Sequence, residues 1–324
     1  MLAIFRFFTI ILQQTNHLYF DIMKRFILSI FVLGIAVSSL ASAYQGDVIY
    51  IDGERWTLMG QPVERDSALF HHLLDVLPQE RRHSSGNWQG YTGYWSIRDG
   101  QLFLDSIRVG FDFDKSVMAT TIFPANNTDG KEIPPFVPAD DMFKVFHDYY
   151  VNGEIVASWI TGKVRVARGH AVKYVHQGYM RKLEHEQYFT INQGRVTDCV
   201  SYQNKIAVKG FSIEEFNSKY RKQDSESREK IRQLIPIPVE NYPDLAGVKG
   251  FVVNVSDIQV DSLGNLVDCR VKINLKGGND ELKERLSQDA KTALMNIRPW
   301  KVLFIDNEYV PETKNFTFRY DLEQ

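Results

Sequence analysis

The pair Asp99-Gly100 constrains the fold of this chain more than any other feature of its sequence. An Asp-Gly pair between two apolar runs is typical of a type I′ hairpin turn, which needs positive φ at both central residues. Counting outward gives four facing pairs: Ile97–Leu102 and Trp95–Leu104 on one face, Ser96–Phe103 and Tyr94–Asp105 on the other. Since one face is apolar and the other is mixed, the sequence predicts a half-covered antiparallel strand pair.

Residues 1–43 have the pattern of an export signal. Lys24-Arg25 precedes an apolar run of about a dozen residues, and Ala41-Ser42-Ala43 has the small side chains of a cleavage site. A membrane-spanning helix needs roughly 20 apolar residues, so this run is short for a permanent anchor. We expect a translation start at Met23, cleavage after Ala43, and a periplasmic or secreted protein. The alternative is an uncleaved signal anchor, which would be the only contact with the membrane.

The composition fits a strand-rich globular protein. The 324 residues are enough for two domains of ordinary size, and the aromatic share of 13% favours β-strands. The net charge of −2 does not provide the basic face that nucleic-acid binding requires. We therefore expect no nucleic-acid partner.

Strand patterns dominate residues 44–210. A hairpin around Asp52-Gly53 comes first, and leucines at helical spacing predict a helix over 66–77. Several prolines predict irregular structure through 108–145. Residues 211–243 begin as a capped helix, are rich in charge, and end at Ile235-Pro-Ile-Pro-Val, which favours a helical connector between two domains.

Residues 244–324 show the clearest periodicity. Two strands, at 251–260 and about 267–273, flank a turn, and a helix follows with an apolar stripe. Further strands are expected at 300–305 and 315–320, the last with Phe316, Phe318 and Tyr320 on one face. The sequence therefore predicts an α+β protein: a strand-rich N-terminal domain followed by a small ββαβ domain.

Residues 242–320 resemble a TonB C-terminal module. The signs are Tyr242-Pro-Asp-Leu before the first strand, the Val260–Leu266 turn, and the Ala-rich helix. The resemblance implies a ββαβ module that grips extended peptides at a sheet edge by main-chain pairing. The strand with Phe316, Phe318 and Tyr320 is the candidate edge. A long Pro-rich spacer is missing and the usual Trp-x-Pro is Trp300-Lys-Val, so energy transduction is not implied.

Residues 47–200 resemble a family of uncharacterised bacterial proteins. The shared motif runs from Trp88 to Ile107, and Trp159–Gly169 and Tyr174–Tyr179 continue it. This resemblance implies no activity.

Few residues point to chemistry. Cys199 and Cys269 allow one disulfide, with two unpaired apolar thiols as the alternative. A cluster of three His and one Glu could hold a metal, but its spacing fits no familiar ligand pattern: His170, His176, Glu184 and His185. The paired side chains His71/His72, Asp112/Asp114 and Asp140/Asp141 are typical of solvated surface. No Gly-x-Ser-x-Gly elbow, phosphate loop or dinucleotide fingerprint occurs.

We therefore expect an exported, non-catalytic binding protein of the bacterial envelope that docks a peptide or protein partner, with no cofactor and no metal. Two alternatives stay open at this point. One is a hydrolase of an envelope polymer that uses carboxylates of the N-terminal domain. The other is a purely structural envelope component.

Overall fold

The computed structural model of the chain describes residues 44–81, 83–110, 136–220 and 224–322. The predicted export signal with its cleavage after Ala43 lies outside these residues, and so do Asp112 and Asp114. The described part of the chain forms a mixed, strand-rich α+β protein with two large hydrophobic cores and a small third cluster at Met59, Ala167 and Leu183. None of its helices has the length and apolar character needed to cross a bilayer.

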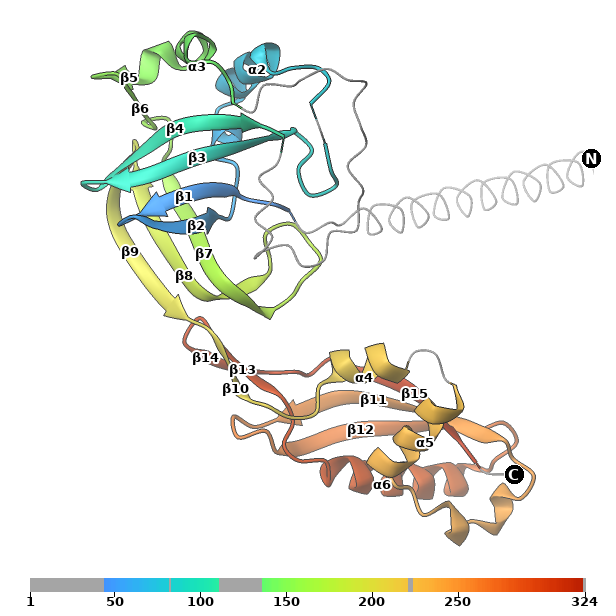
Figure 1. Cartoon of the computed structure of the whole chain (residues 1–324). Helices are drawn as coiled ribbons and strands as arrows, with labels where there is room; N and C mark the ends of the chain where they lie inside the picture. The colour runs from blue at the N-terminus through green and yellow to red at the C-terminus, as the bar shows by residue number, and fades with distance from the viewer. Residues whose placement is uncertain (1–43, 82, 111–135, 221–223, 323–324) are drawn as a thin grey trace, which may run out of the picture.

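The N-terminal strands close into a barrel (Figure 1). Its ring runs in the order β3-β1-β2-β7-β8-β9-β4, and the pairing of β3 with β4 closes it. Only β1 and β3 run parallel among these described pairings. The short strands β5 and β6 extend the sheet beyond β4. The strands are β1 (Asp47–Ile51), β2 (Glu54–Leu58), β3 (Tyr91–Arg98), β4 (Gln101–Val109), β5 (Tyr150–Val151), β6 (Glu154–Val156), β7 (Gly162–Lys173), β8 (Lys182–Asn192) and β9 (Arg195–Gln203).

The hairpin β3–β4 confirms the predicted turn and most of its register. Asp99 and Gly100 have φ of 50° and 70°, as a type I′ turn requires. Three predicted pairs are present: Ile97–Leu102, Ser96–Phe103 and Trp95–Leu104. The fourth is wrong, because Tyr94 faces Ser106 and Asp105 is the extra residue of a β-bulge. The Asp105 carboxylate instead accepts a hydrogen bond from the Ser96 hydroxyl.

Two helices pack on the barrel core. Helix α2 (Ser67–Val76) follows the predicted spacing, and the Asp66 side chain caps it by accepting from the Leu69 amide. Helix α3 (Ala139–Phe146) was not expected, because we predicted irregular structure through 108–145. It begins directly after Pro138, and proline is tolerated at a helix start. The core of this domain unites both helices with the barrel strands. Short 3₁₀ turns lie at η1 (Pro62–Arg65) and η2 (His147–Tyr149).

The C-terminal domain is a three-stranded antiparallel sheet with helices on one face (Figure 1). The strand order is β12-β11-β15, which places β12 and β15 at the two edges. The segment expected as a connector packs into this core through α4 and α5. The elements are α4 (Ile213–Tyr220), α5 (Ser225–Leu234), η3 (Val239–Asn241), η4 (Pro243–Leu245), β11 (Gly250–Val260), β12 (Leu266–Asn274), α6 (Asp280–Met295) and β15 (Phe316–Asp321).

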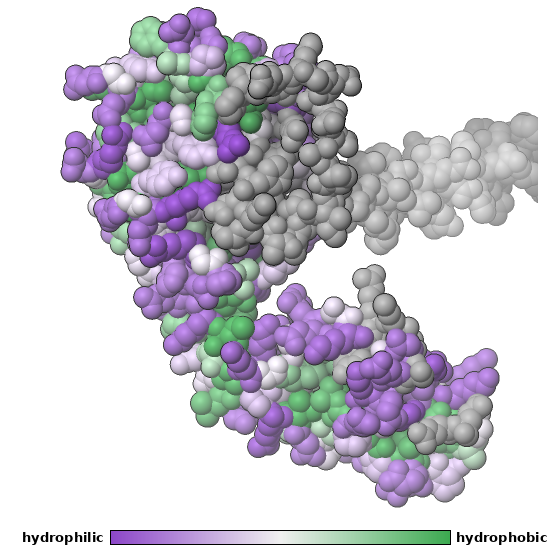
Figure 2. Space-filling view, viewed as in Figure 1, coloured by the Kyte–Doolittle hydropathy of each residue, from purple (hydrophilic) through white to green (hydrophobic). Residues whose placement is uncertain are grey.

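A second small sheet joins the two domains. It consists of β10 (Lys205–Val208), β13 (Val302–Ile305) and β14 (Glu308–Pro311). Only Asn204 separates the end of β9 from the start of β10. Figure 2 shows mostly hydrophilic residues on the visible face of the barrel, and apolar ones over β11 and β12 between α4 and α6.

Asp306, in the turn between β13 and β14, fixes the junction. Its carboxylate oxygens lie 2.9 and 2.6 Å from Lys182 Nζ of the barrel. Its backbone amide donates to the Asn204 side chain (3.0 Å). Burial lowers the pKa of Lys182, but hydrogen bonds to Asp306 and Tyr188 outweigh burial and hold it above its usual range. The lysine is therefore charged, and the two domains share a charge-assisted contact.

Asp306→Asn is expected to weaken the coupling of the two domains by about 1 kcal/mol, because it removes the charge but keeps a residue that tolerates positive φ. The measurement is calorimetric unfolding, in which the transitions of the two domains should move apart. Asp257→Asn is the matched control: Asp257 also has positive φ (51°) and an ion pair with Arg270, but it lies within the C-terminal sheet. Equal effects of both substitutions would contradict a role of Asp306 in the junction.

Candidate functional site

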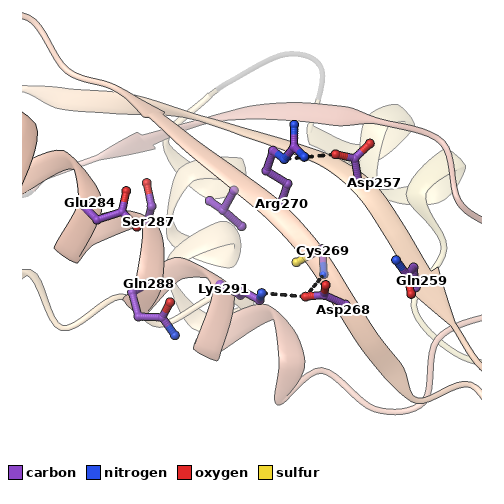
Figure 3. A pocket seen from close by; sticks show the side chains of 10 residues that line it. Asp257, Gln259, Asp268, Cys269, Arg270, Glu284, Ser287, Gln288 and Lys291 are labelled. Atoms are coloured by element: carbon purple, nitrogen blue, oxygen red, sulfur yellow. Dashed lines mark hydrogen bonds and ion pairs between the residues drawn. The ribbon is translucent and has the colours of Figure 1, made fainter.

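A polar groove of about 640 Å³ lies along the edge strand β12 (Figure 3). Four consecutive residues of β12 line it, from Asp268 to Val271. Since successive side chains of a strand point to opposite faces, a hollow touching all four reaches the edge of the strand as well as one of its faces. Helix α6 forms the other wall with Glu284, Ser287, Gln288 and Lys291. Two residues of β11 complete the lining, Asp257 and Gln259.

Two β-bulges shape this end of the sheet. The register passes from Ser256–Arg270 to Gln259–Asp268, so β11 carries one extra residue there. It then passes to Val260–Leu266, so β12 carries one extra residue next. Asp257, within the first bulge, has φ of 51°. Bulges bend and twist a strand locally, and here they lie where the strand pair borders the groove.

Two ion pairs border the groove. Lys291 Nζ lies 2.6 Å from Asp268 Oδ1, and the same oxygen accepts the Cys269 amide at 2.9 Å. The hydrogen bond from Lys291 and then that of the Cys269 amide lower the pKa of Asp268. The hydrogen bond to Asp268 raises the pKa of Lys291 in turn. On the other side, Arg270 Nε lies 3.1 Å from Asp257 Oδ2. The groove therefore presents fixed charges of both signs at neutral pH.

The free side of β12 offers main-chain groups. The Leu322 amide donates to the Lys249 carbonyl (3.1 Å), and such bonds recur at every second residue of an antiparallel ladder. Alternate residues of β11 therefore bond β15, and those between them bond β12. It follows that the amides and carbonyls of Val271 and Ile273 point away from β11. The β12 residues that bond β11 are Arg270, Lys272 and Asn274.

The nucleophilic side chains of the groove are not activated. Cys269 is 3% exposed, and burial raises the pKa of its thiol. A thiol with a raised pKa stays protonated, and the thiolate is the reactive form. The Ser287 hydroxyl donates to the Lys283 carbonyl one turn earlier (2.8 Å). The arrangement therefore suits recognition rather than acyl transfer.

The expected binding residues on β15 have another role. Phe316, Phe318 and Tyr320 share one face, as predicted, but they are only 2–4% exposed and form part of the C-terminal core. The Tyr320 hydroxyl accepts the Ile237 amide at 3.1 Å. Their apolar face packs beneath the helices, so these side chains cannot contact a ligand. The groove lies at the opposite edge of the sheet.

Cys199 and Cys269 are not joined in the structure. Both are free thiols: Cys199 is exposed on β9 of the barrel, and Cys269 is buried on β12 of the other domain. The alternative prediction is two buried, unpaired thiols; both thiols are unpaired, but only Cys269 is buried. A bridge would have to link strands that belong to two different sheets.

The predicted His and Glu cluster is only partly brought together. His170 Nδ1 lies 3.1 Å from Glu184 Oε2, whereas His176 Nδ1 pairs with the Tyr174 hydroxyl at 2.8 Å. In the described ranges, no group of three or more His, Cys, Asp or Glu is placed to hold a metal ion. The remaining candidates lie on helix surfaces: His71 and His72 on α2, and Asp140 and Asp141 on α3.

The sequence did not single out Asp47, whose carboxyl group is buried. It is 1% exposed at the start of β1. Its Oδ1 accepts the Gly93 amide (3.0 Å) and its Oδ2 accepts Trp95 Nε1 (2.9 Å). A Cβ at Gly93 would lie 2.6 Å from Asp47 Oδ2, so glycine is required for this approach. Because both oxygens are occupied by donors of β3, Asp47 joins β1 to β3 and does not face a substrate.

Sequence reasoning missed the groove because its polar residues are neighbours of core positions. Asp268 precedes the buried Cys269, and Lys291 follows the buried Ala290. The periodicity predicts that Cys269 and Ala290 lie in the core, and therefore that Asp268 and Lys291 lie at the surface beside it. The periodicity does not indicate which edge of the sheet α6 borders.

The comparisons with known proteins add no relative. No protein-family model, curated protein or solved structure matches this chain.

Proposed function

We propose that this chain is an exported, non-catalytic binding protein of the cell envelope that captures an extended peptide segment of a partner. The segment adds as a further strand to the free edge of β12 and lies in the groove beside α6. The observation that carries this proposal is the combination of a free strand edge with a groove of about 640 Å³ along it.

The main-chain groups of β12 determine how a peptide would pair. Val271 and Ile273 direct their amides and carbonyls to the free side, so a strand can bond to both. The Cys269 amide already donates to Asp268 Oδ1 (2.9 Å). An added strand would therefore pair with β12 from Val271 onward and not at Cys269. Main-chain pairing provides affinity in this mode, and side-chain contacts provide specificity.

The walls of the groove favour a peptide with mixed charge. Lys291 and Arg270 can meet acidic side chains, and Asp257 and Glu284 can meet basic ones. The resemblance of residues 242–320 to a TonB C-terminal module supports the same mode of binding. The signal pattern of residues 24–43 supports a location in the periplasm or outside the cell.

Val271→Pro tests the proposal. Proline removes an amide that faces away from β11, a position that an edge strand tolerates, and its ring obstructs an added strand. The full chain is panned against random peptides of about ten residues, enough for one strand. We expect selected peptides to bind Val271→Pro at least about tenfold more weakly, through loss of a hydrogen bond and the steric obstruction.

Thr317→Pro is the matched control on the other edge. Thr317 lies on β15, and its amide also faces away from β11 by the same alternation. This variant should retain the selected peptides, and circular dichroism checks that both variants fold. Equal loss of binding in the two variants, or selected peptides that ignore Val271→Pro, would place capture elsewhere than β12.

A further inference from the structure

Four large apolar side chains are exposed at one side of the barrel, far along the chain from the groove. They are Tyr44 (40% exposed), Trp88 (60%), Tyr174 (52%) and Met180 (56%). They come from three segments: the residues just before β1, the loop before β3, and the turn between β7 and β8. We name these four side chains the exposed rim.

Hydrogen bonds hold the three segments of the exposed rim together. The Tyr44 amide donates to the Gly178 carbonyl at 2.9 Å, and the Gln45 amide donates to the Gly86 carbonyl at 2.8 Å. Tyr44 and Tyr179 also pack edge to face, with ring centroids 5.4 Å apart. Figure 1 shows the loop before β3 and the turn between β7 and β8 near the start of β1. The exposed rim is therefore one surface.

The polar atoms of two rim aromatics are bound within the protein. Trp88 Nε1 donates to the Ser85 carbonyl (2.9 Å), and the Tyr174 hydroxyl pairs with His176 Nδ1 (2.8 Å). These bonds restrain the rings while leaving half or more of each side chain in contact with solvent. Trp and Tyr side chains in this state suit the boundary between water and an apolar phase.

The two chain segments that carry most of the exposed rim are rich in basic residues. Residues 81–98, which include most of the loop before β3, and residues 155–183, which include the whole turn between β7 and β8, contain no Asp or Glu; Glu80 lies at the start of the loop before β3. Lys173 directly precedes Tyr174, and Arg181 directly follows Met180, and both side chains are partly exposed. This pattern favours an anionic surface as the partner, because each cation near such a surface gains attraction.

The preceding sequence brings the exposed rim close to a membrane. The apolar run 26–37 is followed by the six residues 38–43, and Tyr44 comes next. Six residues span at most about 20 Å when fully extended. Whenever the apolar run lies in a bilayer, Tyr44 must therefore lie within about that distance of it. After cleavage at Ala43, the new α-amino group would add a positive charge at the same place.

We propose that the exposed rim docks on the surface of an anionic phospholipid bilayer. Trp88, Tyr174 and Met180 enter the headgroup region, and Lys173 and Arg181 lie against the lipid phosphates. The sequence alone suggested membrane contact only through the signal segment, and this surface adds a second one on the folded barrel. It is distinct from the peptide groove, so a bilayer and a peptide can bind together.

Trp88 serves as the reporter in the test. The full chain is bound to phosphatidylcholine vesicles with about 30% phosphatidylglycerol, which supply the anionic surface, and with brominated acyl chains that quench tryptophan at the bilayer. We expect quenching of Trp88, and shielding of Trp88 from acrylamide in the water. The Trp88→Phe variant gives the signal of the other tryptophans, which is subtracted.

Charge variants separate docking of the rim from insertion of residues 1–43. Lys173→Gln and Arg181→Gln should each lower the ratio of docked to undocked Trp88 about fivefold. Tyr309→Ser removes an exposed aromatic on β14 and should leave the quenching unchanged. Trp88 that remains open to acrylamide on bound vesicles would overturn the proposal. So would equal quenching without phosphatidylglycerol, or equal shielding by a soluble anionic polysaccharide.

Discussion

Glu186→Gln is expected to lower the free energy of unfolding of the barrel by about 3–5 kcal/mol, the range for breaking a buried ion pair. Glu186 is fully buried on β8. Arg165 contacts both of its oxygens, and the closer contact is 2.5 Å. Lys182 Nζ lies 3.3 Å from Oε2, and the Leu183 amide donates to Oε1 at 2.9 Å. One carboxylate thus neutralises two partly buried cations.

The loss would be large because the two cations stay where they are. The side chains of Arg165 and Lys182 are only 15% and 18% exposed. Arg165 is also held by the carbonyls of Tyr179 and Arg181, so it cannot turn toward water without further losses. A neutral amide leaves the charge of Arg165 uncompensated in a poorly solvated place, whereas Lys182 keeps its contact with Asp306. Since Lys182 also binds Asp306, the junction of the domains should weaken in the same variant.

Urea unfolding followed by tryptophan fluorescence measures this effect, and Glu184→Gln is the matched control. Glu184 lies two residues away on β8 and pairs with His170, but its side chain is 41% exposed and that of His170 is 93% exposed. Exposed pairs contribute roughly 0–1 kcal/mol, so the control should unfold close to the wild type. If the two variants lost the same stability, Glu186 could not be the centre of a buried network.

Local turn chemistry made part of the fold predictable. Asp99-Gly100 specified a hairpin and three of its residue pairs, because a two-residue turn sets the register by itself. The bulge at Asp105 was not predictable, since it depends on contacts of the closed barrel. A similar signal was overlooked at Asp306-Asn307, which turns between β13 and β14 with φ of 53° and 67°. Both residue types tolerate positive φ.

The long-range strand pairings of the barrel had no local signal. Strand β1 pairs in parallel with β3, although about 40 residues separate them, and β4 meets β9 through the single pair Gln101–Arg195. Alternation of apolar residues identifies a strand and its buried face but not its neighbours. For the same reason the sequence favours the strand with Phe316, Phe318 and Tyr320 as the binding edge and does not point to β12. The predicted alternation on β15 is correct, but alternation does not show that helices cover the face formed by Phe316, Phe318 and Tyr320.

Asp47→Asn is expected to remove a pH dependence of stability worth about 4 kcal/mol between roughly pH 4 and pH 8. Asp47 is 1% exposed. Burial raises the pKa of its carboxyl to about 7, although the hydrogen bonds from Gly93 and Trp95 lower it, and the nearby charge of Glu64 raises it slightly. An ordinary aspartate in the unfolded chain has a pKa of 3.8.

The sign of the effect follows from these two values. Between pH 3.8 and about 7, the folded barrel holds a proton on Asp47 that the unfolded chain has lost. Stability therefore falls as the pH rises through this window, and the loss is complete above the folded-state pKa. Asparagine cannot ionise, so the variant lacks this pH window, but its amide nitrogen cannot accept the hydrogen bond from Gly93 or Trp95 that one carboxyl oxygen accepts. Compared with the wild type, the variant should therefore be less stable near pH 4, and the difference should shift in favour of the variant by about 4 kcal/mol between roughly pH 4 and pH 8.

Urea unfolding of wild type and Asp47→Asn at about pH 4, 6 and 8 measures the difference, which isolates Asp47 from the other titrating groups. Asp52→Asn is the control, because Asp52 is exposed in the turn between β1 and β2 with φ of 52° and asparagine suits that backbone. Its profile should run parallel to that of the wild type. Parallel profiles for Asp47→Asn as well would mean that Asp47 ionises at its ordinary pKa inside the barrel. The bonds from Gly93 and Trp95 would then compensate its burial in full, and the link between β1 and β3 would be a stable carboxylate rather than a carboxyl that is neutral below pH 7.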